Sequence, residues 1–295
     1  MKIILAGSLT YFEAIAIYLA QHVNENYKPI LIFHAGKINE PLSSFMEERH
    51  IPIIGIRSLN DEYEEKIRRL EPDLLICVGF PEILNPRIFN IPKLGTINLH
   101  TSALPKYRGR HPMNWQLING EKEIGITVHF IDDGIDSGDI ILQDSIPIHM
   151  DDDLNDLHTK CLPIAINILI KAIEQIENGT VYRRKQNINM ASYLPLRTPK
   201  DSIIDWKKTG FELHRFINAL VDPMPNAFAY LMDGRLVYFK RSYRSDDDMG
   251  IGRVLGKTKD GKYIITTPEG VILVDIVMED GSVLIPGDKF DFLCE

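Results

Sequence analysis

The stretch 73-DLLICVG-79 is apolar at five consecutive positions, Leu74 to Val78, and ends in a glycine. An apolar run of this length is typical of a β-strand that is covered on both faces. The chain contains several similar apolar runs, and helical patterns over 12–23 and 61–70 lie between some of them. This alternation of strands and helices predicts an α/β domain with a mostly parallel sheet and helices on both faces. The other predicted strands are 2-KIILAG-7, 29-PILIFHA-35, 51-IPIIGI-56, 95-GTINLH-100 and 125-GITVHFI-131.

The chain changes character after residue 150. Apolar residues recur at helical spacing from Asp151 to Gly179 and predict one long helix, which Pro163 should bend or break. Residues 181–204 are irregular, with several prolines and basic residues, and predict a linker. A short helix over Glu212–Leu220 then precedes the turn sequences MDGR, KDGK, PEGV and EDGS, which are typical of hairpins in a small barrel. We therefore expect one domain over 1–180 and a second, β-rich domain over 205–295.

The bulk composition favours a soluble cytoplasmic protein. The chain has 295 residues, and its formal net charge of −8 does not favour nucleic acid or an anionic membrane as a partner. Cys77, Cys161 and Cys294 lie far apart, which indicates neither a disulfide framework nor a zinc site. The apolar start, Ile3 to Ala6, is too short for a secretory signal, and no apolar run is long enough to span a membrane.

Asn98 and His100 alternate at the end of a predicted strand, so their side chains share one face of it. In open α/β sheets, binding sites form outside the carboxyl ends of the strands. The two side chains could therefore belong to a catalytic site, or they could satisfy backbone groups nearby. The sequence pattern alone leaves both interpretations open.

Two further segments could contribute to a site. The acids of 131-IDDGIDSGDIILQ-143 fit Asx turns, although one of them could orient an imidazole. Their spacing lacks the glutamate of a calcium loop, and the nine histidines show no metal spacing, so we expect no metal. The segment 77-CVGFPEIL-84 leaves a strand with an apolar wall, which could pack on its own helix or bind a flat aromatic ligand.

These three segments together resemble the formyltransferases that use 10-formyltetrahydrofolate. The family pattern Asn-x-His-x-Ser-Leu-Leu-Pro is matched from Asn98 to Pro105, with Ala103 in place of the first leucine, and its Gly-x-Asp-Ser/Thr-Gly turn is matched around Asp136. The segment 201–231 is similar to the second domain of members that act on amino sugars and on methionyl-tRNA. The resemblance implies a Rossmann-like formyltransferase domain followed by a small OB-like domain.

The resemblance also implies roles for individual residues. Asn98 would donate its amide to the developing oxyanion, His100 would stabilise that oxyanion or move a proton, and Asp136 would hold the imidazole and favour its charged form. The residues expected to bind the folate are Phe80, Pro81, Glu82, Ile83, Leu84, Asp132 and Asp136. Those expected to bind the acceptor are Ser8, Ser102, Lys106, Tyr107, Arg108 and Arg110, with the cations serving a diphosphate and Tyr107 stacking on a ring.

The family resemblance alone does not determine which amine is the acceptor, because relatives act on nucleotide-linked amino sugars, methionyl-tRNA or a purine precursor. Purine enzymes usually lack a second domain, and here residues 201–295 carry 12 basic and 16 acidic residues, a net charge of −4 that disfavours tRNA. We therefore expect an N-formyltransferase for a nucleotide-linked amino sugar, as in lipopolysaccharide biosynthesis. The alternatives are methionyl-tRNA formylation and an inactive folate-binding or nucleotide-binding module. The sequence is also compatible with a homodimer.

Overall fold

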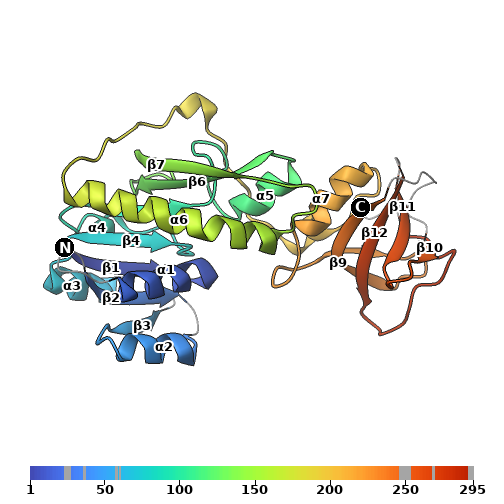
Figure 1. Ribbon diagram of the computed structural model, residues 1–295, viewed down its shortest axis with the longest axis horizontal. Coiled ribbons are helices and arrows are strands. Elements are labelled where there is room, and N and C mark those ends of the chain that lie inside the picture. Colours follow the sequence, from blue (N-terminus) through green and yellow to red (C-terminus); the bar gives the residue numbers. More distant parts are fainter. Residues whose placement is uncertain are drawn as a thin grey trace. The chain divides into compact units, whose positions relative to one another are not determined.

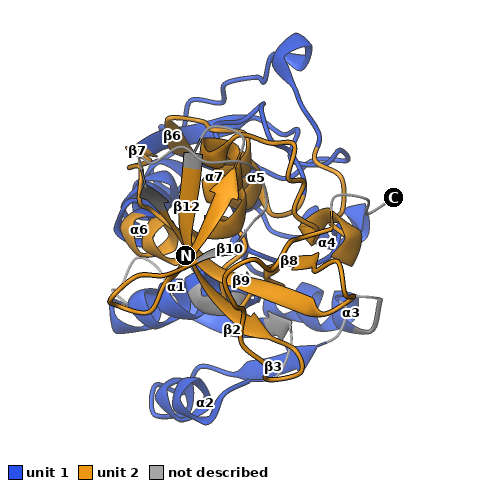
Figure 2. Cartoon of the chain, turned by 90° about the vertical axis from the view of Figure 1, so that its right-hand side faces the viewer, with its two compact units in different colours: residues 1–109, 125–145, 161–193 blue, residues 110–124, 146–160, 194–295 orange. Residues whose placement is uncertain are grey.

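The computed structural model describes residues 1–22, 28–35, 38–56, 59, 61–245, 254–267 and 270–291. Val23, Pro268, Glu269 and Cys294, which entered the predictions above, lie outside these described residues. The chain divides into two compact units: unit 1 contains residues 1–109, 125–145 and 161–193, and unit 2 contains residues 110–124, 146–160 and 194–295 (Figure 2). The domain boundaries expected at 180 and 204 stay a prediction from sequence.

A seven-stranded sheet with the order β3-β2-β1-β4-β5-β6-β7 carries most of the N-terminal half of the chain (Figure 1). The pairs β1–β2, β1–β4, β2–β3 and β4–β5 are parallel, whereas β5 and β6 are antiparallel. The predicted mostly parallel α/β sheet is therefore confirmed. The strands are β1 (Lys2–Gly7), β2 (Lys28–Ala35), β3 (Ile53–Ile56), β4 (Leu74–Val78), β5 (Thr96–His100), β6 (Glu123–Phe130) and β7 (Ile140–Pro147).

The two central strands are buried on both faces, as their continuous apolar runs predict. Every residue of β4 is buried, and so are five of the six residues of β1. Burial on both faces requires helices on both sides of the sheet, because an exposed apolar face would stay in water. The helices of this half are α1 (Leu9–Gln21), α2 (Glu40–Glu47), α3 (Asp61–Leu70), α4 (Pro86–Phe89), α5 (Pro112–Ile118) and α6 (Leu154–Glu177).

The predicted helix over 61–70 coincides with α3, and α1 begins three residues before the predicted start at Phe12. The long predicted helix corresponds to α6, which continues through Pro163 without ending there. No helix in the described part of the chain has both the length and the apolar character needed to cross a bilayer.

The C-terminal half contains a five-stranded sheet with the order β10-β11-β12-β9-β8, in which all the described pairs are antiparallel. Trp206 lies at its core, stacked on Phe290 with a centroid distance of 4.6 Å. Gly234, Gly261 and Gly281 have left-handed φ angles of 87°, 91° and 72°, which confirms three of the predicted glycine turns. The elements are η1 (Ile188–Met190), η2 (Pro199–Ser202), α7 (Gly210–Asn218), β8 (Ala227–Tyr230), β9 (Leu236–Ser245), β10 (Val254–Lys257), β11 (Tyr263–Thr267) and β12 (Gly270–Met278).

Candidate active site

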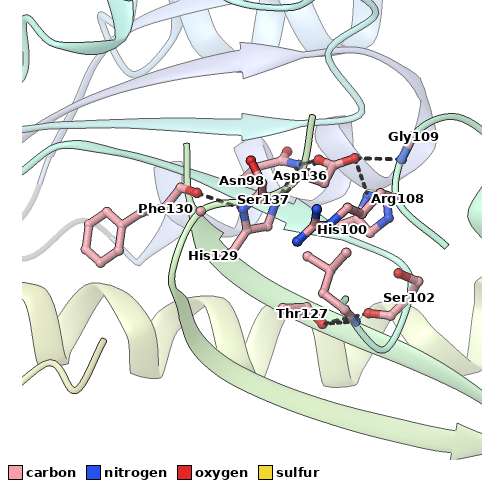
Figure 3. Close-up of polar contacts among 12 residues, drawn as sticks. Asn98, His100, Ser102, Arg108, Gly109, Thr127, His129, Phe130, Asp136 and Ser137 are labelled. Atoms are coloured by element: carbon pink, nitrogen blue, oxygen red, sulfur yellow. Dashed lines mark hydrogen bonds and ion pairs between the residues drawn. The ribbon is translucent and has the colours of Figure 1, made fainter. Parts of the chain in front are cut away.

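The end of β5 presents Asn98 and His100 on one face of the sheet, because alternate residues of a strand point to the same side. β6 runs antiparallel to β5 and places His129 directly opposite Asn98, and Thr127 directly opposite His100. Residues that lie opposite each other in an antiparallel pair share a face. Polar side chains of two neighbouring strands therefore gather at this edge of the sheet (Figure 3).

Asp136 joins this group from the turn between β6 and β7 (Figure 3). Its Oδ1 accepts a hydrogen bond from Asn98 Nδ2 at 3.2 Å, and its Oδ2 accepts the backbone N–H of Gly109 at 2.8 Å. Gly138 makes the turn possible, since a Cβ at this position would lie 1.9 Å from the carbonyl oxygen of Phe130. The structure thus brings together Asn98, His100 and Asp136, the three residues predicted to be catalytic.

The carboxyl group of Asp136 is ionised at neutral pH. Burial by itself would raise its pKa, but His100, His129 and the N–H of Gly109 outweigh burial and hold the pKa of Asp136 well below its ordinary value. The carboxylate lies beside two imidazole rings, and the lowering that the rings contribute acts when they carry a proton, whereas the hydrogen bond from the N–H of Gly109 acts in either state.

The loop after β5 fixes the tautomer of His100. Its Nε2 lies 2.9 Å from the carbonyl oxygen of Tyr107. A carbonyl can only accept, so Nε2 carries the proton. Its Nδ1 lies 3.7 Å from Asp136 Oδ2, which is longer than a hydrogen bond. Burial lowers the pKa of His100, and the charge of Asp136 opposes this only in part, so the resting imidazole is neutral. Asp136 favours the charged form of His100, as expected from the resemblance, but the effect of burial on the pKa of His100 is larger.

His129 is a site residue that the sequence analysis did not select. Its side chain is buried, with Nδ1 2.7 Å from the carbonyl oxygen of Phe130. Its Nε2 lies 3.2 Å from Asn98 Nδ2 and 3.5 Å from Asp136 Oδ1. The sequence offers one signal for it, a histidine inside a largely apolar predicted strand. Only the pairing register of β5 and β6 shows that this histidine faces Asn98.

Hydrogen bonds within unit 1 hold the loop after β5 in place. Ser102 Oγ donates to the carbonyl oxygen of Lys106 at 2.8 Å, and Thr127 Oγ1 donates to the carbonyl oxygen of Ser102 at 2.6 Å. The backbone N–H of Tyr107 donates to Ser192 Oγ at 2.8 Å. Ser102 and Tyr107 are buried, whereas Lys106 is exposed. The contacts of these three residues with an acceptor stay a prediction.

Arg108 is a buried cation with an exposed fraction of 1%. Its Nε and Nη2 donate to Gln186 Oε1 at 3.2 and 2.8 Å, and its Nη1 donates to the hydroxyl of Tyr193 at 2.6 Å. Gln186 Nε2 in turn donates to the carbonyl oxygen of Asp136 at 2.8 Å. A structural role therefore accounts for Arg108, and its predicted contact with a diphosphate gains no support from this geometry. Arg110 is exposed, and its role stays a prediction.

The turn after β4 lies at the same edge of the sheet as the end of β5, because the two strands are adjacent and parallel. Gly79 adopts a left-handed φ of 59°, and its carbonyl oxygen accepts a hydrogen bond from Ser8 Oγ at 2.7 Å. Ser8 thus stabilises the turn, and its predicted contact with the acceptor remains to be tested. Among the predicted folate residues, Leu84 is buried, Phe80 is half-buried, and Pro81, Glu82 and Ile83 are exposed.

Asp132 caps the turn that carries Asp136. Its Oδ1 accepts hydrogen bonds from Ser137 Oγ at 2.6 Å and from the N–H of Gly134 at 3.1 Å. Its predicted folate contact also remains untested. Across the described residues, no group of three histidine, cysteine, aspartate or glutamate side chains is arranged to hold a metal ion.

Comparison with known protein families identifies both halves of the chain. Residues 25–173 match the family described as "Formyl transferase", and residues 197–291 match "Formyl transferase, C-terminal domain". The methionyl-tRNA formyltransferase of Clostridioides difficile is 32% identical over 250 residues, which is 84% of this chain and 81% of that protein. The methionyl-tRNA formyltransferase of Ruminiclostridium cellulolyticum is 33% identical over an alignment of 295 positions, which covers 96% of this chain and 93% of that protein.

Solved structures show the same fold. One is the N-formyltransferase from Helicobacter canadensis in complex with folinic acid and dTDP-3-aminofucose, with a TM-score of 0.70, 24% identity, and coverage of 93% of this chain and 98% of that chain. Another is WlaRD, a sugar 3N-formyltransferase in the presence of dTDP and 5-N-formyl-THF. Its TM-score is 0.69 at 24% identity, and the match covers 94% of this chain and 97% of that chain. At 24% identity the structural likeness establishes only the fold. The family matches and the relatives of 32% and 33% identity establish the family: this chain belongs to the formyl transferase family.

Proposed function

We propose that this protein transfers the formyl group of 10-formyltetrahydrofolate to a primary amine. The observation that carries the proposal is the meeting of Asn98, His100 and Asp136 at one edge of the sheet. The folates in the two similar solved structures support a folate donor. The adjacent turn exposes 73% of Ile83, and a pterin ring needs apolar surface of this kind.

The reaction requires a proton to move between two nitrogen atoms. When the amine attacks the formyl carbon, a C–N bond forms, the amine nitrogen becomes positive and the formyl oxygen becomes negative. The bond to the folate nitrogen must then break, and that nitrogen must receive a proton.

His100 and Asp136 suit this proton transfer. The Nδ1 of the neutral His100 is unprotonated and lies beside the ionised Asp136. It can accept the proton of the amine, the carboxylate stabilises the imidazolium that forms, and the proton then passes to the leaving nitrogen.

Methionyl-tRNA is the acceptor that the comparisons favour. The curated relatives that cover most of this chain at 32% and 33% identity are both methionyl-tRNA formyltransferases. This order reverses the sequence-based expectation, in which the tRNA was the alternative to an amino sugar.

A nucleotide-linked amino sugar is the second candidate, and the charge of the C-terminal half favours it. Several cations there are already paired: Arg235 with Asp233 at 2.9 Å, and Lys262 with Asp260 at 3.0 Å. Arg241 lies 2.9 Å from the carboxylate of Asp153. Cations that are neutralised in this way attract a polyanion such as tRNA less strongly than free ones do.

One experiment separates the candidates. The protein is incubated with 10-formyltetrahydrofolate and either methionyl-tRNA or a panel of dTDP-, UDP- and GDP-linked amino sugars, and tetrahydrofolate formation is followed by absorbance. Turnover with methionyl-tRNA alone supports the first acceptor, and turnover with a sugar alone supports the second. If no amine in either set accelerates donor consumption above the protein-free rate, the proposed function is wrong.

A further inference from the structure

The segment 181–193, which follows α6, contacts two parts of the candidate active site. The backbone of Arg184 pairs with that of Ile140 at the start of β7, through hydrogen bonds of 2.8 and 2.9 Å. Further along the segment, the carbonyl oxygen of Ser192 accepts the backbone N–H of Arg108 at 2.9 Å. The whole segment belongs to unit 1. Residues predicted to form a linker therefore connect β7 with the loop after β5.

Gln186 makes four hydrogen bonds from this segment. Its Nε2 donates to the carbonyl oxygens of Asp136 and Gly138, both at 2.8 Å. Its Oε1 accepts Nε and Nη2 of Arg108 at 3.2 and 2.8 Å. A carbonyl oxygen can only accept and a guanidinium can only donate, so these neighbours fix which way the amide of Gln186 faces. One amide thus joins the turn of Asp136 to the loop after β5.

The backbone of Asp136 requires support of this kind. Its φ angle is 47°, in the left-handed region that residues other than glycine adopt infrequently. Such a conformation persists where surrounding contacts hold it. The two hydrogen bonds from Gln186 Nε2 hold the backbone of this turn. They thereby keep the carboxylate where its oxygens accept Asn98 Nδ2 at 3.2 Å and the N–H of Gly109 at 2.8 Å.

We propose that Gln186 is a positioning residue for formyl transfer, which acts through Asp136. Its Nε2 holds the backbone that carries the carboxylate, and its Oε1 holds Arg108, the residue before Gly109. The carboxylate and the N–H that orients it are therefore both placed by one amide. A carboxylate that turned away would no longer lie 3.7 Å from Nδ1 of His100, and it could not stabilise the imidazolium that forms there.

The inference rests on the proposed formyl transfer, and it does not depend on which amine is the acceptor. Two substitutions separate the functions of the amide. Gln186→Glu keeps the length of the side chain and an acceptor for Arg108, but it has no N–H for the two carbonyl oxygens. Gln186→Met removes all four hydrogen bonds without adding a charge. Asn189→Asp is the matched control, because it exchanges an amide for a carboxylate at an exposed position of the same segment.

We expect the kcat of both Gln186 variants to fall roughly 10- to 100-fold, with little change in the KM of the donor. Asn189→Asp should keep the wild-type kcat. Wild-type kcat in Gln186→Glu would overturn the proposal, because the two carbonyl oxygens lose their donor there while Arg108 keeps its acceptor. An equal loss in Asn189→Asp would assign the effect to the added charge and would also overturn it.

A double-mutant cycle tests whether Gln186 acts through Asp136. If it does, Gln186→Met should lower kcat by less than about threefold in the Asp136→Asn background, because the carboxylate that it positions is already missing. A general weakening of the fold would cost the same factor in both backgrounds. Equal factors in the two backgrounds would therefore contradict the proposal.

Hydrogen exchange tests the positioning without donor or acceptor. The amide hydrogen of Gly109 should exchange at least about tenfold faster in both Gln186 variants, relative to the amide of Ile76 in the buried strand β4, as its bond to Asp136 weakens. No increase relative to Ile76 would overturn the proposal. Because this measurement needs no turnover, it can succeed or fail independently of the proposed function.

Discussion

Replacing Asp136 with asparagine changes the charge of the site while nearly preserving its shape. In the wild type, each carboxylate oxygen has its own donor, Asn98 Nδ2 at 3.2 Å and the N–H of Gly109 at 2.8 Å. An amide has only one oxygen, so one of these contacts becomes an unfavourable pairing of two donors. A buried donor without an acceptor costs about 1–3 kcal/mol, and at about 1.4 kcal/mol per factor of ten this corresponds to roughly 5- to 150-fold in rate.

The lost charge adds to this effect. Asp136 raises the pKa of His100 against the larger effect of burial, so Asp136→Asn lowers the pKa of His100 further. The imidazolium that forms during proton transfer then has no carboxylate beside it. Combining the two effects, we expect kcat to fall by at least about 100-fold, with a smaller change in the KM of the donor.

The assay is the initial rate of tetrahydrofolate formation between pH 5.5 and 8.5. Because neutral His100 is the active form in our proposal, the acidic limb of the kcat profile should lie at lower pH in Asp136→Asn than in the wild type. Asp133→Asn is the matched control, since Asp133 is an exposed carboxylate of the same turn. If Asp136→Asn turns over within about threefold of the wild type, or if its acidic limb moves to higher pH, the assignment of His100 and Asp136 is refuted.

Three other predictions concern the same part of the molecule. Asn98→Ala should lower kcat roughly 100- to 1,000-fold in the same assay while the circular dichroism spectrum is unchanged, and near-normal turnover would remove Asn98 from the mechanism. Arg108→Met should lower the free energy of unfolding in urea by about 1–3 kcal/mol, because the half-buried Gln186 amide oxygen and the Tyr193 hydroxyl lose the buried guanidinium as their donor, whereas Lys106→Met at an exposed position should change it by less than about 0.5 kcal/mol. A change only in the KM of the acceptor would instead identify Arg108 as a binding residue. Burial lowers the pKa of His100, so below pH 6.5 the unfolded chain binds a proton that the folded chain does not. The free energy of unfolding should then fall by up to about 1.4 kcal/mol per pH unit down to the folded pKa, and equal stability at pH 5.5 and 7.5 would contradict this.

Much of the fold is predictable because its causes are local in sequence. A continuous apolar run such as Leu74–Val78 forms a doubly covered strand wherever neighbouring helices supply the cover, and it is buried in the structure. Glycine turns such as the one at Gly234 depend on a single residue that tolerates a left-handed φ. The start of α1 was predicted less well, because helix ends depend on capping and on tertiary contacts beyond the apolar pattern.

The candidate site divides in the same way. The resemblance of the sequence to a family selected Asn98, His100 and Asp136, whereas the residue pattern alone left the role of Asn98 and His100 open and did not distinguish Asp136 from the other acids of its turn. Tertiary structure alone decided three further features. The antiparallel register of β6 placed His129 opposite Asn98. Contacts with Gln186 and Tyr193, 78 and 85 residues further along the chain, hold the guanidinium of Arg108 in a buried position.

Burial also made His100 neutral in spite of a charged neighbour. The physical reason is common to all three. Register, burial and hydrogen-bond partners depend on residues far apart in the chain, and these are defined only when the chain has folded.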